Sequence, residues 1–106
     1  MPDRYQVILL PRAEADLEAI RSYIARDSLR KANAYVAQLV KAMLELDELP
    51  HRHPIHQGRH RPSAVIRRMP VPPYIVYYTV DDVNHRADII TIRHGSRRQP
   101  RNITRS

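Results

Sequence analysis

The stretch from Tyr74 to Arg97, YIVYYTVDDVNHRADIITIRHGSR, constrains the fold more than any other part of the chain. β-Branched and aromatic residues fill two runs within it, and such residues favour strands. The polar segment between the runs, 81–86, is rich in residues that form turns. The sequence therefore predicts a β-hairpin with strands at 74–80 and 87–94, whose second strand leads into basic residues.

Alternation assigns the side chains of this hairpin to two faces. In the first strand one face carries Tyr74, Val76, Tyr78 and Val80, and the other carries Ile75, Tyr77 and Thr79. In the second strand one face is expected to carry Ala87, Ile89, Thr91 and Arg93, and the other Asp88, Ile90, Ile92 and His94.

A strand and a helix are predicted before the hairpin. Tyr5–Leu10 is apolar on both alternating faces, which is typical of an interior strand. Pro11 ends this strand and suits the first position of a helix. Apolar residues three and four apart then predict a helix at about 12–26, with the stripe Leu17, Ile20 and Ile24.

A second helix is predicted at about 29–49. Asp27-Ser28 offers an N-cap, the apolar residues follow the helical repeat, and Pro50 ends it. Because the connection between the two helices is so short, they are expected to form an antiparallel hairpin.

The remaining segments complete an α+β fold. Residues 51–62 are rich in proline and polar residues and predict a loop, and 63–71 predicts a third strand whose nearby prolines favour a sheet edge. The order is β-α-α-β-β-β. We expect the helical hairpin to pack on one face of a small, mainly antiparallel sheet and to leave the other face partly open. One domain is expected at 1–98, with a polar tail at 99–106.

The net positive charge of the chain comes from its second half. Residues 1–48 hold seven Lys/Arg and eight Asp/Glu, a net charge of −1, whereas residues 49–106 hold eleven arginines and three aspartates, a net charge of +8. Arginine forms bidentate contacts with phosphates and carboxylates. The charge therefore predicts an anionic partner, either nucleic acid or an acidic protein, and the alternative is a soluble basic surface.

Several kinds of site are not expected. The chain contains no cysteine, which excludes disulfide and thiolate chemistry. Four histidines invite a zinc interpretation: His51, His53, His56 and His60. Their segment has no acidic residue and no matching ligand pair elsewhere, so neither a metal nor another cofactor is expected. No segment approaches ~20 apolar residues or has the form of a signal peptide, so we expect a cytoplasmic protein without membrane contact.

A series of short segments occurs in a characteristic order: Ala15–Ile20, Tyr23–Ala25, Ala34-Tyr35, Leu49-Pro50, Arg67-Arg68, Pro73–Tyr78 and Ile90–Arg97. Together they resemble the RelE/ParE superfamily of toxins from bacterial type II toxin–antitoxin modules, over about residues 4–98. RelE-like members are ribosome-dependent RNA-cleaving enzymes, whereas ParE-like members poison DNA gyrase and cleave no RNA. The helical hairpin and the ending His94–Arg97 look more like ParE. The resemblance thus implies a gyrase-directed toxin that arrests growth and needs no catalytic residue.

The resemblance leaves a nuclease as the alternative. Cleavage through the 2′-hydroxyl needs a base, cations for the phosphorane-like charge and an acid for the leaving oxygen. The residues that resemble the RelE-like set are Arg67, Arg68, His94 and Arg97. However, the last lysine is Lys41 and no tyrosine follows Tyr78. His94 either titrates in catalysis or orients the turn at Gly95 through hydrogen bonds.

The resemblance also implies a cognate antitoxin, whose acidic segment folds along the toxin. The arginines expected to bind partners are Arg67, Arg68, Arg93 and Arg97, and Arg98 is a further counter-charge. For each of them the alternative is a solvated surface charge that contributes little.

Overall fold

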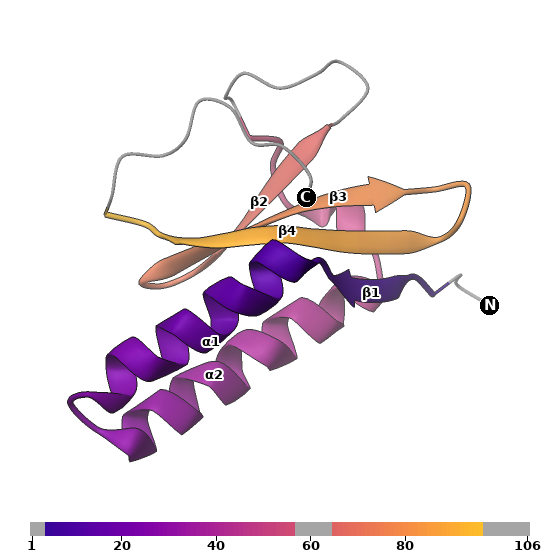
Figure 1. The fold of residues 1–106 in the computed structure, drawn as a ribbon. Helices are drawn as coiled ribbons and strands as arrows, with labels where there is room; N and C mark the ends of the chain where they lie inside the picture. The colour runs from indigo at the N-terminus through magenta and orange to yellow at the C-terminus, as the bar shows by residue number, and fades with distance from the viewer. Residues whose placement is uncertain (1–3, 57–64, 97–106) are drawn as a thin grey trace.

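The structure, a computed structural model, describes residues 4–56 and 65–96. In chain order its elements are β1 (Gln6–Leu9), α1 (Pro11–Ala25), α2 (Leu29–Leu44), the 3₁₀ turns η1 (Glu45–Asp47) and η2 (Pro50–Arg52), β2 (Ile66–Val71), β3 (Tyr74–Asp81) and β4 (Arg86–His94). The two helices form one layer beneath the sheet (Figure 1). This arrangement confirms the predicted α+β fold and the element order.

The four strands form one mixed sheet in the order β1-β4-β3-β2. As predicted, β2, β3 and β4 form an antiparallel meander and β2 lies at an edge. β1 runs parallel to β4, from Gln6 opposite Arg86 to Leu9 opposite Ile89, and lies at the other edge. The prediction of an interior strand was therefore wrong. β1 is apolar because Val7 and Leu9 pack into the core, not because both of its edges are paired.

The helices begin as the sequence predicts. Pro11 occupies the first turn of α1, where its missing N–H costs no hydrogen bond. At the start of α2, the Ser28 hydroxyl accepts a hydrogen bond from the Lys31 backbone N–H at 3.1 Å. Within the two described segments, no helix is both long enough and apolar enough to cross a membrane.

α2 ends earlier than predicted. The α-helix stops at Leu44, the tighter turn η1 follows, and Leu49 adopts a left-handed conformation with φ of 48°. The chain then runs back beside the sheet through η2, and Ile55 forms a bridge with Arg67 of β2. Part of the predicted loop is therefore ordered along the edge of the sheet.

Both faces of the sheet are buried. The face that packs on the helices includes Val76, Tyr78 and Ile89. The opposite face, here called the far face, holds a second apolar cluster of Ile66, Ile75, Tyr77 and Ile90. The expectation that this face is partly open was wrong for these residues, because each is at most 6% exposed.

A β-bulge changes the alternation in β4. Tyr78 lies opposite Ile89 but Tyr77 lies opposite Thr91, so Ile90 is an additional residue on β4. Beyond it, Ile92 joins Ile89 in the helical core instead of sharing a face with Ile90. The strict alternation predicted for 87–94 was therefore wrong after Ile90.

The same bulge determines where the residues at the end of β4 lie. Arg93 lies opposite Ile75 on the far face, and His94 lies opposite Tyr74 on the helical face. Without the additional residue these two side chains would exchange faces.

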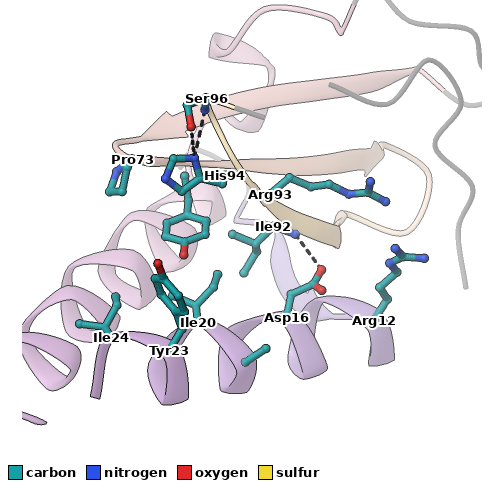
Figure 2. Close-up of a pocket in the computed structure, with 12 residues that line it drawn as sticks. Arg12, Asp16, Ile20, Tyr23, Ile24, Pro73, Ile92, Arg93, His94 and Ser96 are labelled. Carbon is teal, nitrogen blue, oxygen red and sulfur yellow. Dashed lines mark hydrogen bonds between the residues drawn. The ribbon is translucent and has the colours of Figure 1, made fainter. Parts of the chain in front are cut away.

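Asp16 of α1 secures β4 just beyond the bulge. Because β1 ends opposite Ile89, the later residues of β4 have no strand on that side. The Asp16 carboxylate accepts hydrogen bonds there from the Thr91 hydroxyl and, at 3.0 Å, from the Ile92 backbone N–H (Figure 2). A helix side chain thus replaces a missing strand neighbour.

We predict that Asp16→Ala lowers the free energy of unfolding by about 1–3 kcal/mol, since it leaves the buried Thr91 hydroxyl and the Ile92 amide without their acceptor. Glu18→Ala, on the exposed side of α1, is the matched control and should change stability by less than about 0.5 kcal/mol. Urea unfolding measures both. Equal stability of the two variants would show that the Asp16 contact does not hold β4.

Candidate functional site

Arg67 has a structural role in β2. Its Nη1 donates hydrogen bonds to the backbone carbonyls of His51 at 3.0 Å and His53 at 2.9 Å. Opposite Arg67, the buried Tyr78 hydroxyl donates to the Pro50 carbonyl at 2.5 Å. Burial raises the pKa of Tyr78 to about 12, and the nearby Arg67 charge acts in the opposite direction. Together the two side chains fasten the η2 segment to the sheet.

Arg68 and Arg93 lie on the far face and are here called the far-face arginine pair. Arg68 lies opposite the buried Tyr77, and Arg93 lies opposite Ile75 on the next strand. Burial raises the pKa of Tyr77, and the positive charges of both arginines act in the opposite direction. The Arg68 Nε is buried and has no hydrogen-bond partner in the described part of the chain.

This pair is a candidate anion site. Two guanidinium groups on one face offer several N–H donors in planar forks that match phosphate or carboxylate groups. The apolar side chains of Ile75 and Tyr77 on β3 lie between the two arginines. They lower the local dielectric, which strengthens the attraction of the guanidinium groups to an anion.

His94 contacts the turn that follows β4. Its Nδ1 accepts a hydrogen bond from the Ser96 backbone N–H at 3.1 Å and lies 2.7 Å from the Ser96 hydroxyl (Figure 2). Its ring meets that of Tyr74 edge to face at 5.1 Å. The Gly95 N–H donates to the Pro73 carbonyl at 2.7 Å in the same turn. These contacts match the turn-orienting alternative for His94.

Of the candidate nuclease residues, the structure describes Arg67, Arg68 and His94, and it does not bring these three together. Arg67 and Arg68 point to opposite faces of β2. Arg67 and His94 share the helical face, but their partners Tyr78 and Tyr74 are separated along β3 by about 13 Å. Arg97 and Arg98 lie outside the described residues.

A cleft of about 760 Å³ lies between α1 and the end of β4. Arg12 and Arg93 border one part of it and their guanidinium groups extend in the same direction, while Ile20 and Ile24 form an apolar wall (Figure 2). Tyr23, which is 62% exposed, lies beside this wall. Arg12 and Tyr23 were not predicted as site residues. They border a cleft because β1 is short and leaves this side of the end of β4 uncovered, and the sequence pattern did not predict where β1 pairs.

The histidines of the predicted loop have other contacts. His51 Nε2 lies 3.0 Å from the Asp82 carboxylate, and the His53 ring lies edge to face with Tyr78. Burial lowers the pKa of His53, and the charge of Arg52 lowers it further. Over residues 4–56 and 65–96, no three His, Cys, Asp or Glu side chains form a group that could hold a metal ion. His60 lies outside these ranges.

We predict different effects for the two neighbouring arginines of β2. Arg67→Ala should lower the free energy of unfolding by about 1–3 kcal/mol, because two backbone carbonyls lose their donor. Arg68→Ala should change it by less than about 1 kcal/mol, because it removes a buried N–H that lacks an acceptor. Chemical denaturation of both variants checks this, and an equal loss in both would contradict the assigned roles.

Comparison with known proteins agrees with this fold. Residues 7–99 match the family described as ParE toxin of type II toxin-antitoxin system, parDE. The chain is 38% identical over 93 residues to Toxin RelE2 of Caulobacter vibrioides, covering 87% of this chain and 97% of that protein.

Solved structures show the same architecture. A structure of the chromosomal ParDE system from P. aeruginosa has a TM-score of 0.65 and 24% identity, covering 87% of this chain and 97% of its own. A structure of the RelBE2 toxin–antitoxin complex from Mycobacterium tuberculosis has a TM-score of 0.60 and 21% identity, covering 86% and 91%. With the family match over most of its length, this chain belongs to the ParE toxin family of type II toxin–antitoxin systems, within the RelE/ParE superfamily.

Proposed function

We propose that this toxin acts by binding DNA gyrase and blocking its cycle, without cleaving RNA. The observation that carries the proposal is that the acid and base groups beside the cations already have structural hydrogen bonds. His94 and Asp16 line the same cleft as Arg93, but His94 Nδ1 is bound to Ser96, and the Asp16 carboxylate accepts from Thr91 and Ile92. Phosphodiester cleavage needs proton transfer at both oxygens, so cations whose neighbouring groups are engaged in this way suit binding better.

The far-face arginine pair gives the proposed binding a chemical basis. A DNA-handling enzyme presents phosphates of its bound DNA and carboxylates of its own acidic surfaces, and arginine binds either group in bidentate geometry. The position of both side chains on strands, rather than on a loop, holds them at a fixed separation.

We predict that the purified protein inhibits DNA supercoiling by gyrase. The double variant Arg68→Ala/Arg93→Ala should need at least about tenfold more protein for the same inhibition, because each charge-assisted contact contributes about 1.5–3 kcal/mol. Arg21→Ala, which removes one arginine from α1, is the control and should inhibit normally. Undiminished supercoiling across a wide molar excess of the wild-type protein would refute the proposal.

A ribosome-dependent endoribonuclease is the second candidate. The name of the similar toxin RelE2 favours it, and so does the position of two arginines around the buried phenol ring of Tyr77. It would use Arg67, Arg68, His94 and Arg97 for charge stabilisation and proton transfer. A translating extract distinguishes the two candidate functions. Codon-positioned cuts in mRNA that disappear in His94→Ala would support the nuclease, and intact mRNA would rule the nuclease out.

We further propose that a cognate antitoxin neutralises this toxin by occupying the cleft between α1 and β4. The solved relatives include a toxin–antitoxin complex. An acidic segment would find Arg12 and Arg93 at one part of the cleft, and its apolar side chains would find Tyr23 and Ile24. Since Arg93 also belongs to the far-face arginine pair, a segment in the cleft would occupy part of the proposed gyrase-binding site. One shared residue would thus make neutralisation and toxicity mutually exclusive.

We predict that Tyr23→Ala weakens antitoxin binding by about tenfold or more, because exposed aromatic residues often dominate such interfaces. Calorimetry with the cognate antitoxin, which is expected to be a small acidic protein encoded beside the toxin, measures this. Val83→Ala, at an exposed position in the β3–β4 turn, is the control, and inhibition of gyrase by Tyr23→Ala should be unchanged. Equal antitoxin affinity for Tyr23→Ala and the wild type would show that the antitoxin does not bind in this cleft.

A further inference from the structure

α2 carries a mostly apolar stripe beside its core-facing side. Its members recur three and four residues apart along one side of the helix, and Asn33 is their polar member: Leu29, Asn33, Val36, Ala37, Val40 and Leu44. Val40 also packs against the core, whereas the two ends of the stripe are exposed. Most of them line a shallow groove that ends at η1. Leu29 is 56% exposed and Leu44 58% exposed, whereas the core-facing Leu39 and Met43 are buried. The stripe is thus an amphipathic face without a described partner.

The charges at the two ends of this stripe are opposite. Arg30 lies in the first turn of α2 and Glu45 caps its last turn, and both are exposed. The two residues are fifteen positions apart, which is about 22 Å along a helix and close to the same side. Lys41 and Asp47 line the groove beside Glu45, so this end holds one positive and two negative side chains. The stripe therefore has a positive end, a mostly apolar middle and a net negative end.

We propose that the α2 stripe binds a second copy of this chain in an antiparallel, two-fold symmetric pair. A two-fold axis beside Ala37 brings Arg30 of each copy level with Glu45 of the other, so two ion pairs flank one apolar contact. A parallel pair would set like charges side by side. A uniformly acidic partner would meet Glu45 unfavourably, so the charge pattern favours the chain itself.

Such a pair is compatible with the proposed function but does not depend on it. No α2 residue lines the cleft between α1 and β4, and both helices lie on one side of the sheet (Figure 1). Arg68 and Arg93 lie opposite residues of the far face, on the other side of the sheet. Each copy would keep its cleft and its arginines accessible, and the pair would present two binding faces.

Sedimentation equilibrium of the full chain tests this proposal over micromolar to millimolar concentration. The apparent mass should rise from 12.4 kDa towards twice that value. Ala37→Arg should abolish the rise by placing two arginines at the axis, whereas Gln38→Arg, with the same charge change outside the stripe, should leave it intact. Circular dichroism verifies that both variants remain folded.

A charge exchange tests the orientation of the pair. Arg30→Glu or Glu45→Arg alone should weaken association by about tenfold, since each change replaces two attractive pairs with two repulsive ones. The double variant Arg30→Glu/Glu45→Arg should restore association to within about threefold. A monomer at every concentration, an Ala37→Arg variant that still associates, or a double variant that is no stronger than the single ones would overturn the proposal. The proposal would likewise be overturned if the toxin stays monomeric and Leu29 and Leu44 become shielded from solvent when the antitoxin binds. The α2 stripe would then bind a heterologous partner.

Discussion

The register of β4 against β3 is the constraint on which the rest of this molecule depends. The additional residue Ile90 shifts every later side chain of β4 by one face, so Arg93 reaches the far face and His94 the helical face. The bulge lies where β1 ends, and Asp16 of α1 accepts the Ile92 N–H on the side that no strand covers. Strand pairing, helix docking and the position of the site charges are therefore parts of one arrangement.

The separation of the arginines into two roles follows from the same sheet. Arg67 and Arg68 are neighbours of identical chemistry, yet one donates to backbone carbonyls on the helical face and the other lies beside Tyr77 on the far face. A strand makes this division unavoidable because adjacent side chains point to opposite faces. Arg93 joins Arg68 only because of the bulge, and it also borders the cleft. That double position is the physical basis for the proposed link between antitoxin binding and loss of toxicity.

Local patterning predicted the elements, the helical hairpin, the meander and the two faces of β3, because hydrophobic period and turn chemistry are properties of neighbouring residues. It missed features that depend on distant segments. The edge position of β1 depends on pairing with residues some eighty positions away, and the bulge at Ile90 depends on the register of β3. Of the candidate site, Arg68 and Arg93 were identifiable from sequence, whereas Arg12 was not. The structural role of Arg67 was not, since its acceptors come from η2 and the residue after it, and neither was the cleft, since it forms between α1 and β4.

The central claim is that the far-face arginine pair, and not Arg67 or His94, contacts the target. Arginine modification by phenylglyoxal, read by mass spectrometry with and without gyrase, tests it most directly. We expect Arg68 and Arg93 to react in the free protein and to become protected in the complex, while Arg67, held by two carbonyls, reacts slowly in both states. Unchanged reactivity of Arg68 and Arg93 in the complex, or protection acquired by Arg67 instead, would contradict the account.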